Sequence, residues 1–354
     1  MAFARLLLKT LAWCALIWAL LILPTLAVWP LASSRPLSLS PPDYLGPPKA
    51  SLFVGEIQEA VYEIGRHCPL PPRKRLILLG GSGARGFEPE LLAGATGADE
   101  VLNVSLVLSN FTQMRQVYAD LVACLGEEGM RQTTFVVVPS LGSFTSNKMR
   151  FEGAYSDYET EKLRSRLYAG VPGAVAPVVN RVWLPLAIEL WRPVMLTRKL
   201  IVKGQEAAAW LRARLHPVPA AAGPDREQSL NWIAELLPQE DASAAFAPEQ
   251  TGQMQLLVAD MRARGSTVLL VEQPTQAWVR ERSKAYADSH QTLIAQAGKL
   301  GLPYIDLSTT GEDSEFHDGM HANAAGAKAW SGRLREALQA LGRQEPEALG
   351  AVKP

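Results

Sequence analysis

Leu76–Gly86 reads LILLGGSGARG, and this stretch decides how the rest of the chain is interpreted. Its first four residues form a continuous apolar run, which is typical of a parallel strand covered on both faces. The glycine-rich segment Gly80–Gly83 ends the run, because glycine permits a tight backbone turn. A serine on such a turn, here Ser82, would present its hydroxyl group at the carboxyl end of a strand, where active sites of parallel sheets lie.

Four more apolar runs are spaced like strands of the same sheet. They are Val101–Val107, Thr134–Val138, Thr267–Val271 and Pro303–Leu307. Helical patterns lie at Phe87–Ala95, from Asn110 to about Leu125, and at Val279–Leu300. Strands that alternate with helices predict right-handed crossovers and a parallel sheet with helices on both faces. We therefore predict a three-layer α/β/α domain with about five strands, spanning residues 51–345.

A second stretch, Phe316–Trp330, reads FHDGMHANAAGAKAW and opens the last predicted helix. A serine hydroxyl is a weak nucleophile until a base removes its proton, and neutral imidazole is the usual base. The imidazole in turn needs an acceptor on its other nitrogen, which fixes its tautomer. Asp318 and His321 supply the acceptor and the base from one short segment. We predict that they form a nucleophilic triad with Ser82.

The same segment also offers a metal site, because His317, Asp318 and His321 are all potential ligands. A His-x-x-x-His pair normally binds a metal from one face of a helix. Gly319 lies inside this spacing and disfavours a helix there. The triad is therefore the favoured interpretation, and neither a metal nor another cofactor is expected.

The front of the chain has a different composition. Thr10–Trp29 carries no charge over 20 residues, which is long enough for a helix to cross a hydrocarbon core of ~30 Å. Arg5 and Lys9 precede it, so the positive-inside rule places the N-terminus in the cytoplasm and the main domain outside. Residues 1–29 are interpreted as an anchor in the cytoplasmic membrane. The alternative is a cleaved signal peptide, whose apolar core usually spans only ~7–15 residues.

Two further segments lie outside the predicted sheet. Pro30–Ala50 is rich in proline and serine and is interpreted as an extended linker. A long and mostly helical insertion, about Gly142–Gln255, separates the third strand from the fourth. Within it, Trp183–Leu200 fits either a helix packed on the core or a segment on the membrane surface. Residues 346–354 are left as a tail.

Composition restricts the classes of function. The chain has 354 residues, of which 48% are hydrophobic, so it can bury a substantial core. Its net charge is zero, and it shows neither a basic stripe nor a nucleic-acid-binding module, so no nucleic-acid partner is expected. Cys68 and Cys124 fit either one disulfide in an oxidising compartment or two buried thiols.

The order of these blocks resembles the SGNH hydrolase superfamily. That superfamily has a serine turn after its first strand, here Gly81-Ser82, and an Asp-x-x-His before its final helix, here Asp318–His321. Asn323 and Gly326 follow the histidine, as such proteins often show. More narrowly, the chain looks like the membrane-anchored, exported branch that includes the alginate O-acetylation proteins and the lipoteichoic-acid D-alanylation protein. The similarity covers about residues 75–140 and 267–341.

The resemblance implies an SGNH or flavodoxin-like sheet and an acyl-serine mechanism on esters, in the first place acetyl esters, of a cell-envelope or secreted polysaccharide. It also raises a membrane-bound O-acyltransferase as a candidate partner. The implied activity is that of an exported serine esterase or O-acyltransferase. The alternative is an inactive SGNH-like scaffold or glycan-binding component of an envelope polysaccharide assembly.

The oxyanion hole is where this sequence departs from the family pattern. The resemblance implies a glycine N–H and an asparagine side chain from the middle blocks. No glycine follows the second strand here, and Ser109 and Asn110 offer backbone N–H groups instead. The candidate asparagine is Asn147, several residues later than the family pattern. These three residues are the predicted oxyanion or substrate-binding positions.

Overall fold

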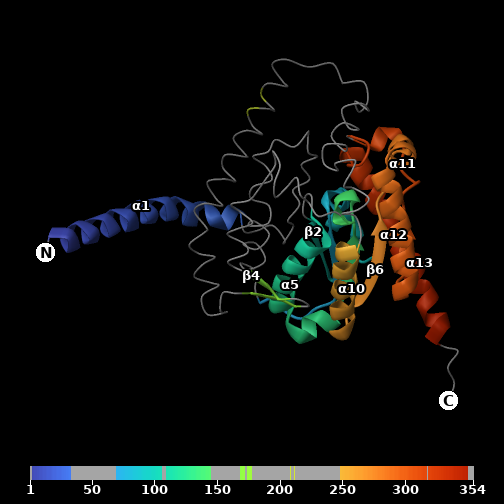
Figure 1. Ribbon diagram of the computed structural model, residues 1–354, viewed down its shortest axis with the longest axis horizontal. Helices are drawn as coiled ribbons and strands as arrows, with labels where there is room; N and C mark the ends of the chain where they lie inside the picture. Colours follow the sequence, from blue (N-terminus) through green and yellow to red (C-terminus); the bar gives the residue numbers. More distant parts are fainter. Residues whose placement is uncertain are drawn as a thin grey trace. The chain divides into compact units, whose positions relative to one another are not determined.

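The computed structural model describes residues 2–32, 69–105, 109–144, 168–171, 174–177, 208, 211, 248–316 and 318–349. The chain divides into two compact units. One unit contains helix α1, and the other contains the sheet and the helices around it (Figure 1). The account that follows treats each unit by itself.

The larger unit is built on a five-stranded parallel sheet with the strand order β2-β1-β3-β6-β7. The strands are β1 (Arg75–Gly80), β2 (Glu100–Ser105), β3 (Thr133–Val138), β6 (Thr267–Glu272) and β7 (Tyr304–Asp306). Each of the five apolar runs in the sequence contains one of these strands or most of it. The predicted α/β fold with a parallel sheet is therefore confirmed.

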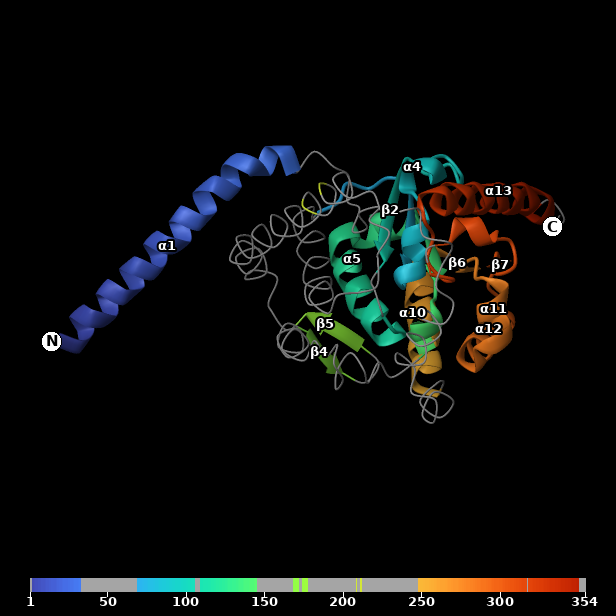
Figure 2. The same ribbon diagram turned by 90° about the horizontal axis from the view of Figure 1, so that it is seen from above.

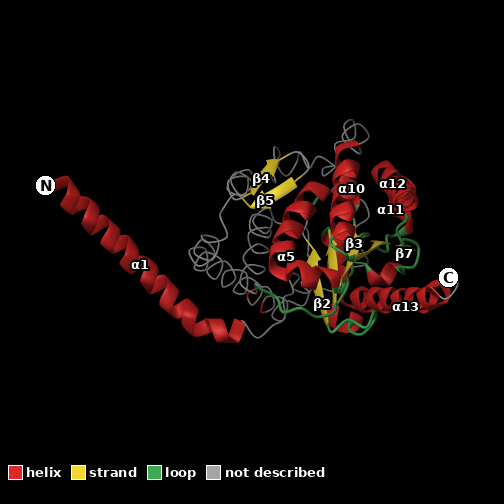
Figure 3. Cartoon of the chain, turned by 90° about the horizontal axis from the view of Figure 1, so that it is seen from below, coloured by secondary structure: helices red, strands yellow, loops and turns green. Residues whose placement is uncertain are grey.

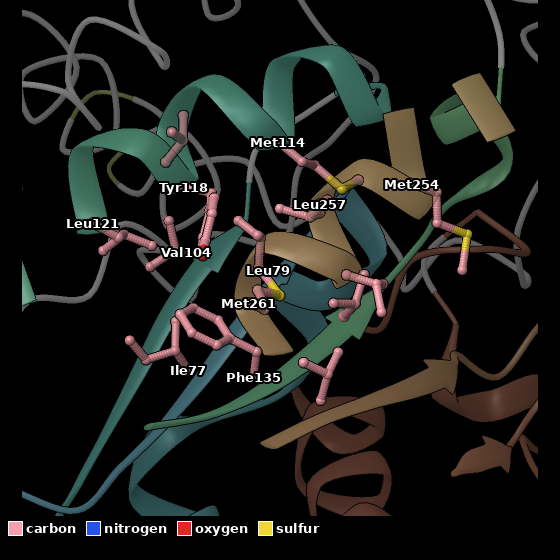
Figure 4. Packing of buried hydrophobic residues seen from close by; sticks show 14 of the residues in the cluster. Ile77, Leu79, Val104, Met114, Tyr118, Leu121, Phe135, Met254, Leu257 and Met261 are labelled. Carbon is pink, nitrogen blue, oxygen red and sulfur yellow. The ribbon is translucent and has the colours of Figure 1, made fainter. Parts of the chain in front are cut away.

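Helices cover both faces of this sheet, as Figures 2 and 3 show. The helices α5 (Phe111–Arg131), α10 (Pro248–Ala263) and α12 (Lys284–Leu300) lie on one face. The helices α4 (Pro89–Leu92) and α13 (Ala324–Leu349) lie on the other. Neighbouring residues of a strand point to opposite faces, so Leu79 packs beneath α5 and α10 (Figure 4) while Leu78 belongs to the cluster beneath α13.

Several helix boundaries differ from the prediction. The helix expected at Phe87–Ala95 is reduced to the four residues of α4, preceded by the 3₁₀ helix η1 (Ser82–Gly86). The helix expected at Val279–Leu300 is two helices, α11 (Ala277–Arg282) and α12. Ser283 separates them, and its side chain caps α12 by accepting the Tyr286 N–H at 3.1 Å. The last helix, α13, extends to Leu349, into the residues 346–354 that were left as a tail.

The predicted insertion is only partly described. Most of the insertion lies outside the described residues, so its mostly helical character stays a prediction. Two short antiparallel strands, β4 (Tyr168–Val171) and β5 (Ala174–Pro177), lie within it and were not predicted. A β-hairpin of four-residue strands is too short for its pattern to be told from a helical one. The expected linker Pro30–Ala50 and the ambiguous stretch Trp183–Leu200 lie outside the described residues.

Helix α1 (Ala2–Ala32) contains the stretch that was expected to anchor the chain. Between residues 5 and 20 its large apolar side chains other than Trp18 are exposed, namely Leu6, Leu7, Leu8, Leu11, Trp13, Leu16, Ile17 and Leu20. A search of the described part of the chain finds no helix with the length and apolarity needed to cross a membrane. The anchor stays a prediction.

Cys124 is buried on α5 and is disulfide-bonded, whereas Cys14 is free. Cys68, its expected partner, lies outside the described residues. Of the two alternatives that the sequence left open, a free thiol at Cys124 is excluded.

Candidate active site

The serine turn exists because β1 and β3 approach each other closely at their carboxyl ends. The Gly81 N–H donates to the Val138 carbonyl at 3.2 Å. A Cβ at Gly80 would overlap that carbonyl, and a Cβ at Gly81 would come within 2.7 Å of the Ser140 Cβ. Only glycine therefore fits at both positions. Ser82 follows them as the first residue of η1 and is half-buried.

The turn after Ser82 is fixed from β2 and from α13. Asn103, fully buried on β2, donates from Nδ2 to the carbonyls of Ala84 at 2.8 Å and Phe87 at 2.9 Å. On the other side, a Cβ at Gly86 would stand 2.7 Å from the Trp330 ring of α13. A backbone held from two elements in this way keeps Ser82 in one place.

The loop before α13 carries the other two members of the predicted triad. Asp318 Oδ1 accepts the backbone N–H of Met320 at 3.2 Å and of His321 at 2.9 Å, so the carboxylate folds its own loop. Gly319 has φ +90°, a conformation that side chains with a Cβ rarely adopt. Asn323 then caps α13, since its Oδ1 accepts the Gly326 N–H at 2.9 Å.

Ser82, His321 and Asp318 meet in the order that a triad requires. His321 Nε2 lies 2.8 Å from Ser82 Oγ, and His321 Nδ1 lies 2.7 Å from Asp318 Oδ2. An ionised Asp318 accepts, so Nδ1 carries the imidazole proton and Nε2 accepts the Ser82 hydroxyl proton. Serine and histidine are 239 positions apart in the chain. The fold brings all three predicted catalytic residues together.

The pKa of Asp318 lies below its ordinary value. Burial by itself would raise that pKa. The charge interaction and hydrogen bond with His321, together with the two backbone N–H donors, outweigh the burial. The ionised form of Asp318 is thus the one that the loop stabilises.

The predicted oxyanion residues have different surroundings. Ser109 is fully buried, and its hydroxyl donates to the Gly80 carbonyl at 3.2 Å. Asn110 caps α5, where its N–H donates to Gln113 Oε1 at 3.0 Å and its Oδ1 accepts the Gln113 N–H at 3.1 Å. This capping box engages the Asn110 N–H that was expected to face an oxyanion. Asn147 lies outside the described residues.

Two polar residues at this edge of the sheet were not predicted as part of the site. Ser140 follows β3 and lies against Gly81, and its backbone N–H donates to Ser143 Oγ at 2.8 Å. Gln273 follows β6 and lies against Gly83. Gln273 comes directly after β6 and Ser140 two residues after β3, so the position after a strand end was a signal that the sequence reasoning did not apply to them.

The metal alternative depended on His317, which lies outside the described residues. Among the residues that are described, no group of three histidine, cysteine, aspartate or glutamate side chains is arranged to hold a metal ion. Asp318 and His321 instead bond to each other and to Ser82.

Comparisons with known proteins add little to this geometry. No protein-family model matches the chain, and no curated protein matches it. A solved structure from Bacteroides fragilis, described as a "putative acylhydrolase", matches 84% of this chain and 100% of its own at 12% identity, with a TM-score of 0.40. A likeness at this identity and TM-score assigns no function to the chain.

Gly319→Ala should destabilise the protein by about 1–3 kcal/mol, because the added Cβ meets a positive φ and stands 2.6 Å from the Trp278 ring. Urea unfolding followed by circular dichroism measures the change. The control is Gly332→Ala on α13, where nothing lies within 4 Å of the new Cβ. It should be neutral or stabilising by about 0.5–1 kcal/mol. Equal midpoints for the two variants would contradict the expectation.

The lowered pKa of Asp318 predicts a pH dependence of stability. Its contribution is fully present above the unfolded pKa of about 3.9 and is lost as the pH falls through the lower folded pKa. The unfolding free energy of the wild type should therefore exceed that of Asp318→Asn by a constant amount between about pH 7 and 5, and the difference should shrink below about pH 4. Urea titrations across this range measure it. A difference that grows on acidification would show that the sign is wrong.

Proposed function

We propose that the protein is an exported serine esterase or O-acyltransferase of the SGNH type. It acts on acyl esters, in the first place acetyl esters, of a cell-envelope or secreted polysaccharide. The observation that carries the proposal is the continuous chain of contacts from Ser82 Oγ through His321 to Asp318, at 2.8 and 2.7 Å. Nucleophile, base and orienting carboxylate each have their partner at hydrogen-bond distance.

The proposed reaction starts when Ser82 Oγ attacks the acyl carbonyl carbon while His321 Nε2 takes the hydroxyl proton. Asp318 stabilises the imidazolium that forms. The carbonyl oxygen becomes negative, and the backbone N–H groups at the start of η1 are our candidates for its donors. When the C–O bond of the ester breaks, His321 returns the proton to the leaving alcohol, and an acyl-serine remains.

The second half of the proposed reaction uses an oxygen nucleophile. His321 takes a proton from water or from a sugar hydroxyl, whose oxygen attacks the acyl-serine, and Ser82 regains its proton as the acyl group leaves. Water gives hydrolysis, and the sugar gives transfer. For transfer we propose a membrane-bound O-acyltransferase as the partner that supplies the acyl group.

One experiment distinguishes hydrolysis from transfer. The enzyme is given an O-acetylated oligosaccharide, first alone and then together with an unacetylated acceptor, and the amounts of free acetate and of acetylated acceptor are measured.

Ser82→Ala should abolish covalent labelling by a fluorophosphonate probe and lower the turnover of p-nitrophenyl acetate by at least ~10³-fold, since no other group replaces the activated oxygen. Gel fluorescence and absorbance measure the two quantities. Ser289→Ala is a matched control that removes a buried serine hydroxyl on α12 and leaves the triad intact, so labelling should persist. Equal labelling of wild type and Ser82→Ala would refute the assignment and favour a non-catalytic scaffold.

We further propose that residues 10–29 hold the protein in the cytoplasmic membrane, with the main domain on the outer side. The exposed apolar side chains of α1 and the basic residues Arg5 and Lys9 support this arrangement. The disulfide at Cys124 supports an oxidising compartment.

Expressed in a Gram-negative host, the full chain should stay in the membrane pellet after a carbonate wash. The same chain without residues 1–29, directed to the periplasm by a cleavable signal sequence, should be soluble. Protease added to spheroplasts should digest the main domain of the full chain. A full chain that the wash releases, or one that protease reaches only after lysis, would contradict the proposed anchor or its orientation.

A further inference from the structure

Gln273 connects β6 to the loop that carries the base. It directly follows the last residue of β6, at the carboxyl edge of the sheet, and is only 7% exposed. Its side-chain Nε2 donates to the carbonyl of Met320 at 2.9 Å. Met320 lies immediately before His321, so this hydrogen bond holds the backbone from which the imidazole extends.

The same side chain also lies against the serine turn. A Cβ built at Gly83 would overlap the Gln273 amide group, so only glycine leaves room for the amide there. Gly83 immediately follows Ser82 in the chain. The Gln273 amide group thus lies between Gly83, which follows Ser82, and Met320, which precedes His321. It extends to both from the end of β6.

Packing alone does not explain why residue 273 is a glutamine. Its Oε1 is buried and has no hydrogen-bond partner among the described residues. A buried acceptor without a partner carries a desolvation cost that an apolar side chain of similar shape would avoid. Methionine would fill nearly the same volume without that cost, but it could not donate to the Met320 carbonyl. The donor group is what distinguishes glutamine here.

We propose that Gln273 is a positioning residue that sets the separation of Ser82 Oγ and His321 Nε2. This inference rests on the proposed function of the Ser82 site. The amide fixes the Met320 carbonyl on one side and limits the approach of the serine turn on the other. Proton transfer between two groups depends steeply on their distance, and a displacement of about 1 Å can lower a rate by about 10²-fold. Gln273 touches neither reacting atom and acts through the two residues beside them.

Gln273→Met tests the inference with the fluorophosphonate probe and with p-nitrophenyl acetate. The rate constant for labelling Ser82 should fall by about 10- to 100-fold, and kcat for the ester should fall similarly with little change in KM. The melting temperature should change little, because the loss of the hydrogen bond to the Met320 carbonyl is offset by removal of the unpartnered acceptor. The control is Gln255→Met on α10, which removes a glutamine hydrogen bond of 2.8 Å to Gln296. It should label at the wild-type rate.

Gln273→Glu adds a second measurement, the pH dependence of the labelling rate. This dependence would not change if Gln273 only stabilised the fold. A protonated carboxyl group can donate to the Met320 carbonyl, whereas an ionised one cannot and repels it. The labelling rate of this variant relative to wild type should therefore be highest at acidic pH and fall as the pH rises. The same ratio for Gln273→Met should change little with pH.

The outcomes are separable. Labelling of Gln273→Met within twofold of wild type overturns the inference, and so does a pH profile of Gln273→Glu parallel to that of wild type. If Gln273→Met does not fold, the profile of Gln273→Glu decides alone. Failure of the proposed function is recognised differently, because Ser82→Ala would then label as well as wild type, and the inference would fall with it.

Discussion

The two oxygens of the Asp318 carboxylate have different partners, and the arrangement of the site depends on both. Oδ1 accepts the backbone N–H groups of Met320 and His321, which folds the loop before α13. Oδ2 accepts the imidazole Nδ1–H, which orients the ring toward Ser82. Loop geometry and imidazole orientation are therefore set by one group, and its ionised state serves both, as the direction of its pKa indicates.

The sheet was predictable because most residues of its four longer strands are buried. Runs such as Leu76–Leu79 are apolar at every position, and this pattern is visible in the sequence alone. The helix boundaries were harder, since they depend on single contacts. The extended backbone of Ser283 ends one helix and its hydroxyl caps the next, yet the apolar period continues across it. The pattern therefore predicted one helix where the structure has two.

The site was predictable to the extent that it is local. Asp318 and His321 lie in one turn, and the glycines around Ser82 mark a tight approach, so both halves could be recognised separately. The partners of Gln273 could not be predicted, because its contacts join the end of β6 to the turn after β1 and to the loop before α13, segments far apart in the chain. The capping of α5 by Asn110 is a similar case. Its backbone N–H was expected to face an oxyanion, whereas it donates to the Gln113 side chain.

Ser82 follows the first strand of the sheet, whereas His321 precedes the last helix, 239 residues later. A partly synthesised chain thus carries the nucleophile for most of its length without the base that activates it. In the proposed mechanism the hydroxyl becomes reactive only when the loop before α13 has packed against the turn after β1. In the proposed exported protein, whose main domain crosses the membrane after the anchor, this order would leave the serine without its base until the whole domain has crossed and folded.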